Sequence, residues 1–137
     1  MIFIKRRLLG LPIYETTLVD LIKVLDNKIR KNEKAVVFGL SAGAYGRLKR
    51  RKDLVELYQK MDILIADGQG IPLLGKLFGV PIRESIGIVN LTYRMLQLAN
   101  ENNYKVLMFG ATQEINNKAN KVIKENYPNI RLCSGIN

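Results

Sequence analysis

The sequence contains no histidine and only one cysteine, Cys133. Zinc sites built on these two residue types and nucleophile triads that depend on histidine are therefore excluded. A single cysteine forms no intramolecular disulfide, which fits a reducing cytoplasm. Because Cys133 lies in an apolar, strand-like stretch, we expect it to fill part of the core. Acid–base chemistry is left to carboxylates, lysine or tyrosine.

Long hydrophobic runs are also absent. No apolar stretch approaches the length of a membrane-spanning helix, and the N-terminus has apolar Met1–Ile4 before basic Lys5–Arg7, the reverse of a signal peptide. These features predict a cytoplasmic protein. The length of 137 residues, 47% of them hydrophobic, predicts one domain over residues 1–137 with a genuine core.

Acidic residues are scarce, at 12 against 22 basic ones, and the net charge is +10. Residues 1–52 carry 13 basic and 4 acidic residues, a net charge of +9, whereas residues 53–137 are nearly neutral. This asymmetry indicates an anionic partner, namely a phosphorylated ligand, an anionic membrane surface or nucleic acid. The alternative is a solvated surface that keeps the protein in solution.

Strand-like and helix-like segments alternate along the chain. We predict strands over 2–5, 8–13, 35–39, 63–66, 105–109 and 130–133, and helices over 18–31, 42–50, 53–61, 71–78, 89–102 and 113–126. This order is typical of an α/β fold with a Rossmann-like parallel sheet, helices on both faces and a short N-terminal strand or hairpin. Right-handed crossovers would place the loops 39–43, 67–70 and 110–113 along one edge of the sheet.

Thr17 and Asp53 are expected to cap the helices over 18–31 and 53–61, and the strand 35–39 is expected to be buried. The last helix is expected to have one apolar stripe, formed by Ile115, Ala119, Val122 and Ile123.

The most informative segment is Ile63–Pro72, where an apolar run ends in Asp67 and the glycines Gly68 and Gly70 follow. In open α/β sheets, ligands bind beyond the carboxyl ends of the strands, so an acid at this position is a candidate for chemistry. The glycines allow a tight turn and the close approach of a ligand. The alternative is that Asp67 only caps the following helix.

The motifs and their order resemble those of the WecG/TagA/CpsF glycosyltransferase family over almost the whole chain. The matching pieces are Leu-Gly-Leu-Pro-Ile at 9–13, Ile-Ala-Asp-Gly-Gln-Gly-Ile at 65–71, Gly-Val-Pro-Ile-Arg at 79–83, Met-Phe-Gly-Ala at 108–111 and Tyr-Pro at 127–128. The Asp-Gly-x-Gly element is the most specific of them.

The resemblance implies transfer of an N-acetylmannosamine-type sugar from a UDP donor to a polyprenyl-diphosphate-linked acceptor at the cytoplasmic face of the membrane. Such a reaction serves the synthesis of teichoic acid or another surface polysaccharide. It is an inverting displacement without an essential metal or cofactor, and Asp67 matches the base that accepts the proton of the acceptor hydroxyl.

Several further residues are candidates for substrate binding. Gly110, Ala111, Thr112 and Gln113 follow a strand and open a helix, so their backbone amides are candidates to face a phosphate or uridine. The alternative is an ordinary turn with Thr112 as the helix cap. Arg83 is a candidate to meet the diphosphate of the donor or of the lipid. The remaining candidates are Ser41, Gly68, Gln69, Gly70 and Asn90.

The sequence departs from the family at four of its positions. Gly39 and Ser41 stand where the family usually carries Thr and Asn, and Ser85 and Asn90 stand where it carries Arg and Asp. Loss of an arginine near a diphosphate removes a charge-assisted clamp. The chain also ends at Asn137, before the family's usual C-terminal tail. A second hypothesis is therefore a catalytically impaired accessory or nucleotide-binding relative.

A basic cluster lies at Arg47, Lys49, Arg50, Arg51 and Lys52. With Lys5–Arg7 it is a candidate to contact anionic lipid headgroups at the inner face of the plasma membrane. The alternative is a solvated helix end. No nucleic-acid-binding motif accompanies the cluster, so we do not expect a nucleic-acid partner. An apolar helix face left uncovered by a missing tail predicts a homo-oligomer.

Overall fold

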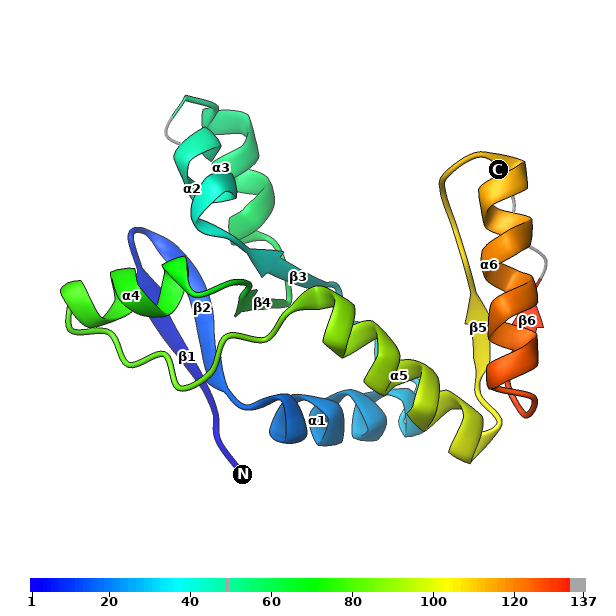
Figure 1. Cartoon of the computed structure of the whole chain (residues 1–137). Helices are drawn as coiled ribbons and strands as arrows, with labels where there is room; N and C mark the ends of the chain where they lie inside the picture. The colour runs from blue at the N-terminus through cyan, green and yellow to red at the C-terminus, as the bar shows by residue number, and fades with distance from the viewer. Residues whose placement is uncertain (49, 134–137) are drawn as a thin grey trace. The chain divides into compact units, whose positions relative to one another are not determined.

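The computed structural model describes residues 1–48 and 50–133, without the side chain of Lys52. It shows a mixed α/β chain in two compact units, residues 1–91 and 92–137 (Figure 1). The elements are β1 (Phe3–Leu8), β2 (Leu11–Thr16), α1 (Leu18–Arg30), β3 (Val37–Leu40), α2 (Ala42–Leu48), α3 (Lys52–Gln59), β4 (Ile63–Ala66), α4 (Gly70–Leu77), α5 (Ile88–Asn102), β5 (Lys105–Leu107), α6 (Gln113–Asn126) and β6 (Arg131–Cys133).

The mixed α/β class is confirmed, but one large Rossmann-like sheet is not seen in the described part of the chain. Its strands form three pairs instead: antiparallel β1–β2, parallel β3–β4 and parallel β5–β6. Within residues 1–48 and 50–133, no helix is long and apolar enough to cross a membrane.

The N-terminal hairpin differs in register from the prediction. Leu9 and Gly10 form its two-residue turn, with φ of +53° and +84°, which is the conformation that matches the twist of a tight hairpin. The predicted strand 8–13 was wrong because it ran through this turn. Alternation along β2 buries Leu11 and Ile13, and the same face also carries the acidic side chain of Glu15.

The first unit is organised around β4, all four residues of which are buried. β4 pairs in parallel with β3, so that Gly39 lies opposite Ile65 and Leu40 opposite Ala66. The predicted strand 35–39 was displaced by one to two residues and was not fully buried. Phe38 is 44% exposed and packs edge-to-face against Tyr58, because β4 is the one described strand that pairs with β3.

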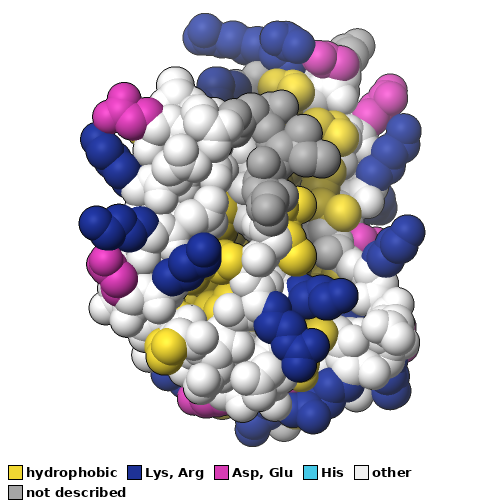
Figure 2. Space-filling view, turned by 90° about the vertical axis from the view of Figure 1, so that its right-hand side faces the viewer, with side chains coloured by type: hydrophobic (Ala, Val, Ile, Leu, Met, Phe, Trp, Pro, Cys, Tyr) yellow, Lys and Arg dark blue, Asp and Glu magenta, His cyan; other side chains and the backbone are white. Residues whose placement is uncertain are grey.

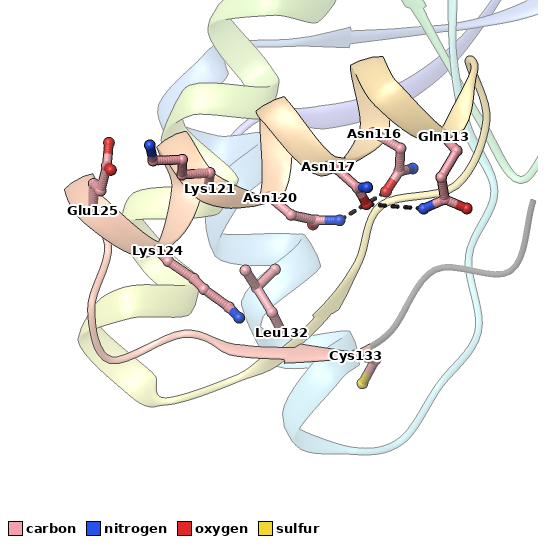
Figure 3. Close-up of a pocket in the computed structure, with 9 residues that line it drawn as sticks. All are labelled: Gln113, Asn116, Asn117, Asn120, Lys121, Lys124, Glu125, Leu132 and Cys133. Atoms are coloured by element: carbon pink, nitrogen blue, oxygen red, sulfur yellow. Dashed lines mark hydrogen bonds between the residues drawn. The ribbon is translucent and has the colours of Figure 1, made fainter.

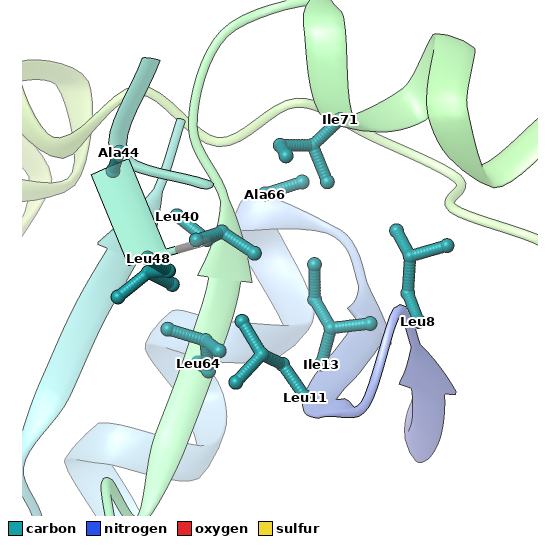
Figure 4. Close-up of a cluster of buried hydrophobic side chains, with 9 residues drawn as sticks. All are labelled: Leu8, Leu11, Ile13, Leu40, Ala44, Leu48, Leu64, Ala66 and Ile71. Atoms are coloured by element: carbon teal, nitrogen blue, oxygen red, sulfur yellow. The ribbon is translucent and has the colours of Figure 1, made fainter. Parts of the chain in front are cut away.

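Figure 4 shows an apolar cluster within this unit. Its buried members come from the hairpin, β3, α2, β4 and α4: Leu8, Leu11, Ile13, Leu40, Ala44, Leu48, Leu64, Ala66 and Ile71. Tyr45 packs against the edge of this cluster. The core therefore fixes the ends of β3 and β4, where the candidate site begins.

Two helix caps were predicted in this unit, and one was wrong. Thr17 caps α1, because its hydroxyl accepts a hydrogen bond from the Asp20 amide at 3.1 Å. Asp53 was predicted to cap α3, but α3 begins one residue earlier and its N-cap is Arg51, with no side-chain cap bond. Asp53 instead pairs with the Arg51 guanidinium at 2.6 Å.

The second unit is small and its core is limited to the contact of α5 and α6 with β5 and β6. Leu96, Ala99, Ile123 and Ile130 are its buried apolar residues. The predicted apolar stripe of α6 was partly wrong, since Ile115 and Val122 are 57% and 55% exposed. Cys133 is exposed as well, so the prediction that it fills the core was wrong: within this strand it is Leu132 that packs against the cluster.

Candidate functional site

Asp67 lies directly after β4, at the end of two parallel strands, as the sequence predicts. Its backbone N–H donates to the Leu40 carbonyl at 2.9 Å, which continues the β3–β4 pairing by one residue. The side chain is half-buried. Within the described residues, its carboxylate has no hydrogen-bond or ion-pair partner. A half-buried, unpaired carboxylate at a strand end is available to accept a proton.

The helix that follows does not use Asp67 as a cap. α4 begins at Gly70, its N-cap is Gln69, and no side chain makes a cap hydrogen bond there. The alternative interpretation, that Asp67 only caps this helix, is therefore wrong, because the N-cap is Gln69 and no side chain makes the cap hydrogen bond.

The two glycines after Asp67 have different roles. Gly68 has φ of +77°, a conformation that favours glycine. At Gly70, a Cβ atom would lie 2.6 Å from the Cβ of Ala42. The close approach that Gly70 permits in this structure is thus that of α2, and the contact holds the starts of α2 and α4 together.

Gly39 and Gly87 both lie close to Asp67. A Cβ atom on Gly39 would lie 3.1 Å from the Asp67 Cβ and 2.7 Å from Ile88 Cγ1. A Cβ on Gly87 would lie 4.0 Å from Asp67 Oδ1. The Ile86 amide donates to the Ala66 carbonyl at 2.8 Å, so the segment before α5 runs against the end of β4. Sequence reasoning missed Gly87, for which no local pattern gave a signal.

Ser41 stands close to this point, but its hydroxyl is engaged. Its Oγ accepts the Ala44 amide at 3.1 Å, and its carbonyl accepts the Tyr45 amide at 2.9 Å. These bonds start α2. Gly39 and Ser41 are the two positions of this loop that differ from the family pattern. Gly39 therefore contributes only close packing, and Ser41 mainly caps the start of α2.

Arg83 is held by an acid that sequence reasoning did not single out. Its Nε donates to Glu15 Oε1 at 2.9 Å, while Arg6 donates through Nε and Nη2 to Oε2 at 2.9 and 2.7 Å. Hydrogen bonds from Arg6 and then Arg83 lower the pKa of Glu15 from its ordinary value of 4.5. The signal in the sequence was an acid on the apolar face of β2, since a buried charge requires partners.

A hollow of about 710 Å³ runs beside α4, from Gln69 to Arg83. Lys76 also lines it, together with the apolar residues Pro72, Leu73, Val80, Pro81 and Ile82. Its size is within the range of small-molecule sites. Gln69 and Arg83, two of the residues predicted to bind substrate, thus border one space, whereas Ser85 is half-buried and Asn90 is exposed in the first turn of α5.

The turn Gly110–Gln113 belongs to the second unit. Gly110 and Ala111 both have positive φ, +107° and +60°, and the Thr112 hydroxyl accepts the Ile115 amide at 3.4 Å. Thr112 is therefore a helix cap, as the alternative interpretation held. Glu114 in the first turn is paired with Lys118 at 2.6 Å and places negative charge where an anion would bind.

A second hollow, of about 660 Å³, lies along α6 and β6 (Figure 3). Side-chain amides of Gln113, Asn116, Asn117 and Asn120 form much of its wall, with Lys121 and Lys124 further along the helix. The amides pair with one another: Gln113 Nε2 donates to Asn117 Oδ1 at 2.8 Å and Asn120 Nδ2 to Asn116 Oδ1 at 2.7 Å.

The basic cluster is described only in part. Lys49 lies outside the described residues, as does the side chain of Lys52, while Arg47, Arg50 and Arg51 are exposed. Arg51 pairs with Asp53, and this pairing raises the pKa of Arg51. Lys and Arg side chains are also dispersed over the face shown in Figure 2, with few acidic ones among them.

Metal ligands of the usual kind do not gather in the described part of the chain, where no group of three or more His, Cys, Asp or Glu residues is placed to hold an ion.

Comparison with known proteins agrees with the motifs of the sequence. Two relatives from Staphylococcus aureus, of strains MRSA252 and NCTC 8325 / PS 47, are each 29% identical over 79 residues, 58% of this chain and 31% of the relative. Both bear the name N-acetylglucosaminyldiphosphoundecaprenol N-acetyl-beta-D-mannosaminyltransferase. The match spans about a third of their length. The model of the Glycosyl transferase WecG/TagA/CpsF family matches residues 6–136, and the chain belongs to this family.

Proposed function

We propose that this chain supplies the catalytic carboxylate of a glycosyltransferase in the synthesis of a cell-surface polysaccharide. The reaction is transfer of an N-acetylhexosamine-type sugar from a UDP donor to a polyprenyl-diphosphate-linked acceptor. The observation that carries the proposal is the half-buried Asp67 carboxylate, unpaired among the described residues, at the ends of β3 and β4. Family membership and the names of the relatives support the reaction class.

In this reaction the acceptor hydroxyl oxygen attacks the anomeric carbon of the donor sugar. The new C–O bond forms as the bond to the UDP oxygen breaks, and UDP leaves with that electron pair. The hydroxyl proton passes to the carboxylate of Asp67, which acts as general base. A single displacement of this kind inverts the anomeric configuration. The proposed proton transfer uses no metal, because the Asp67 carboxylate takes the hydroxyl proton directly.

The donor site is proposed to include the glycine-bearing turns. Gly68, Gln69 and Gly70 follow Asp67 directly, and Gln69 and Arg83 line the hollow beside α4. Gly110, Ala111, Thr112 and Gln113 are proposed for the phosphates or uridine, with the side chains of Ser41 and Asn90 as further contacts. We also propose that the parallel pairs β3–β4 and β5–β6 belong to one Rossmann-like sheet, which the alternation of strands and helices supports.

Because the proposed acceptor is lipid-linked, the protein is proposed to work at a membrane surface. The cluster Arg47, Lys49, Arg50, Arg51 and Lys52 is proposed to contact anionic headgroups at the inner face of the plasma membrane, where each cation adds about 1 kcal/mol to binding. The net charge of +9 in residues 1–52 supports this role.

A second candidate function is a relative that binds the nucleotide without transferring sugar. Two observations favour it: Gly39 offers no side-chain group near Asp67, and the Ser41 hydroxyl is engaged in capping α2. Both functions predict binding of UDP, and only the first predicts transfer.

The experiment compares the 137-residue chain with Asp67→Asn and with the control Glu56→Gln, which neutralises an exposed carboxylate on α3. Sugar transfer from UDP-N-acetylmannosamine to a synthetic lipid diphosphate acceptor is measured, and UDP binding is followed by thermal shift. We expect Asp67→Asn to slow transfer by about 10²- to 10⁴-fold, with UDP binding kept. Transfer that survives in Asp67→Asn would refute the role of Asp67, whereas UDP binding without transfer by the unaltered chain would favour the second function.

A further inference from the structure

Glu15 is a buried acid on a face of β2 that otherwise carries Leu11 and Ile13. Its side chain is only 4% exposed and joins two arginines, Arg6 at 2.7 Å from Oε2 and Arg83 at 2.9 Å from Oε1. Burying a carboxylate costs hydration, and an ion pair often recovers no more stability than apolar residues of similar size would give. Stability alone therefore does not account for an acid at this position.

Arg83 uses only its Nε–H group to contact Glu15. The bond to Oε1 is 2.9 Å long, and within the described residues the N–H groups on Nη1 and Nη2 of Arg83 make no hydrogen bond. The side chain is 56% exposed and borders the hollow of about 710 Å³ beside α4. The guanidinium is thus anchored at Nε, while its two outer nitrogens remain available to a ligand.

The loop that carries Arg83 runs from α4 to α5 (Figure 1) and is bonded to the rest of the first unit at two further points. Glu84 Oε2 accepts the Leu18 amide at 2.9 Å, at the start of α1. The Ile86 amide donates to the carbonyl of Ala66 at 2.8 Å, and Ala66 is the residue directly before the proposed base. A guanidinium on a loop fixed in this way loses little conformational freedom when a ligand binds, which favours affinity.

The charges near this loop include acids, and each acid has a role of its own. Glu15 and Glu84 already accept hydrogen bonds from the protein, and Asp67 is the proposed base. The charged side chains that line the hollow itself, among the described residues, are Lys76 and Arg83. The outer nitrogens of a guanidinium match the oxygens of a phosphate group in spacing and charge. A ligand with phosphate oxygens therefore suits the Arg83 end of the hollow.

We propose that Glu15 is a positioning residue, which holds Arg83 so that Nη1 and Nη2 contact the diphosphate of the UDP donor in the hollow beside α4. The inference rests on the proposed function and adds to it a residue that does not touch the substrate. As UDP leaves, Arg83 stabilises the negative charge that develops on the diphosphate. Arg6 occupies the other carboxylate oxygen of Glu15 and helps to hold the carboxylate in place.

The test measures binding of UDP, and of uridine, which lacks the diphosphate, to the 137-residue chain by titration calorimetry. Arg83→Gln removes the guanidinium, Glu15→Gln removes the charge that holds it, and a double variant carries both changes. Glu15→Asp keeps the charge on a shorter side chain and takes the place of Glu15→Gln if that variant does not fold. Arg6→Gln is the matched control, because it removes the other ion pair of the same carboxylate but leaves the bond to Arg83. Thermal melting verifies that each variant folds.

We expect Arg83→Gln to weaken UDP binding by about 10- to 100-fold and Glu15→Gln by about three- to tenfold, with uridine binding unchanged in both. Glu15→Gln should have no further effect once Arg83 is replaced, because Glu15 acts through Arg83. Glu15→Asp should lie between Glu15→Gln and the unaltered chain, and Arg6→Gln should bind UDP as the unaltered chain does.

Normal UDP binding by Glu15→Gln would overturn the inference and leave the proposed function intact. Equal losses of UDP and uridine affinity, or additive losses in the double variant, would also overturn it, because they would show that Glu15 has a purely structural role. Normal UDP binding by Arg83→Gln, with a raised KM for the lipid diphosphate acceptor, would assign Arg83 to the acceptor instead. If the unaltered chain binds no UDP, the proposed function fails and the inference fails with it.

Discussion

Gly39 and Ile88 occupy one space beside Asp67: a Cβ atom on residue 39 would lie 2.7 Å from Ile88 Cγ1 and 3.0 Å from its Cδ1. The residue that the family usually carries at position 39, a threonine, therefore fits this structure only when Ile88 moves. The glycine and the isoleucine are matched to each other.

We predict that Gly39→Thr lowers the stability of the chain by about 1–3 kcal/mol, because the new side chain is forced against Ile88 and the Cβ of Asp67. Ile88→Ala alone should cost less, since Ile88 is 37% exposed. The double variant should be more stable than the sum of the single effects predicts. Urea denaturation of the four proteins measures this coupling, and additive effects would contradict the contact.

Gly70→Ala should destabilise the first unit for a related reason. The added methyl group would lie 2.6 Å from the Cβ of Ala42, which is fixed to the backbone of α2 and cannot rotate away. We expect a loss of about 1–3 kcal/mol, read as a lower melting temperature. Gly46→Ala is the control: it also lies in a helix but has open space around its Cβ position, so it should raise stability by about 0.5–1 kcal/mol.

The pairing of Glu15 with two arginines predicts a defined dependence of stability on pH. The pKa of Glu15 is lowered by folding from its ordinary value of 4.5. The stability that this pairing contributes is therefore complete above about pH 4.5 and is lost as the pH falls through the folded-state pKa. Glu15→Gln should lack this part of the acid sensitivity.

The measurement is the free energy of unfolding of the chain and of Glu15→Gln between pH 3 and 7. Because Asp20, Glu33 and Asp53 also have lowered pKa values, the difference between the two proteins is the informative quantity. It should be constant near neutral pH and shrink as the pH falls below about 4.5. A difference that does not change with pH would contradict the ion pairs.

Local patterns in the sequence were sufficient to predict those features that depend on the residues of one segment alone. β4 was predicted with its observed bounds, and Thr17 was identified as the cap of α1. Asp67 was placed correctly at the end of β4 because an apolar run that stops at an acid marks both the strand and its end.

Features that depend on distant neighbours were not predicted. Asp53 has the residue type of a cap, yet its partner is the Arg51 side chain, which competes for the carboxylate. The burial of Glu15 depends on Arg83, 68 positions away. Likewise, the pattern of α6 does not specify which of its residues are covered, and Asn116 is buried there while Ile115 is exposed.

Asn116 links α6 to the turn proposed to face the donor. Its side chain is 5% exposed, and its Nδ2 donates to the carbonyls of Met108 and Gly110 at 3.0 and 3.2 Å. These bonds support a turn in which Ala111, a residue with a side chain, has φ of +60°. Replacing the amide by an apolar group of similar size leaves both carbonyls without this donor.

We therefore predict that Asn116→Leu destabilises the chain by about 1–3 kcal/mol and accelerates hydrogen exchange in residues 108–113. Asn117→Leu is the matched control, because Asn117 is the exposed neighbour on the same helix and its loss should change stability by less than about 0.5 kcal/mol. If Gly110–Gln113 contact the nucleotide, Asn116→Leu should also weaken UDP binding in proportion to the loosening of the turn. Unchanged exchange in residues 108–113 would show that the positive φ values of Gly110 and Ala111 are held by the turn itself and that Asn116 has no part in positioning it.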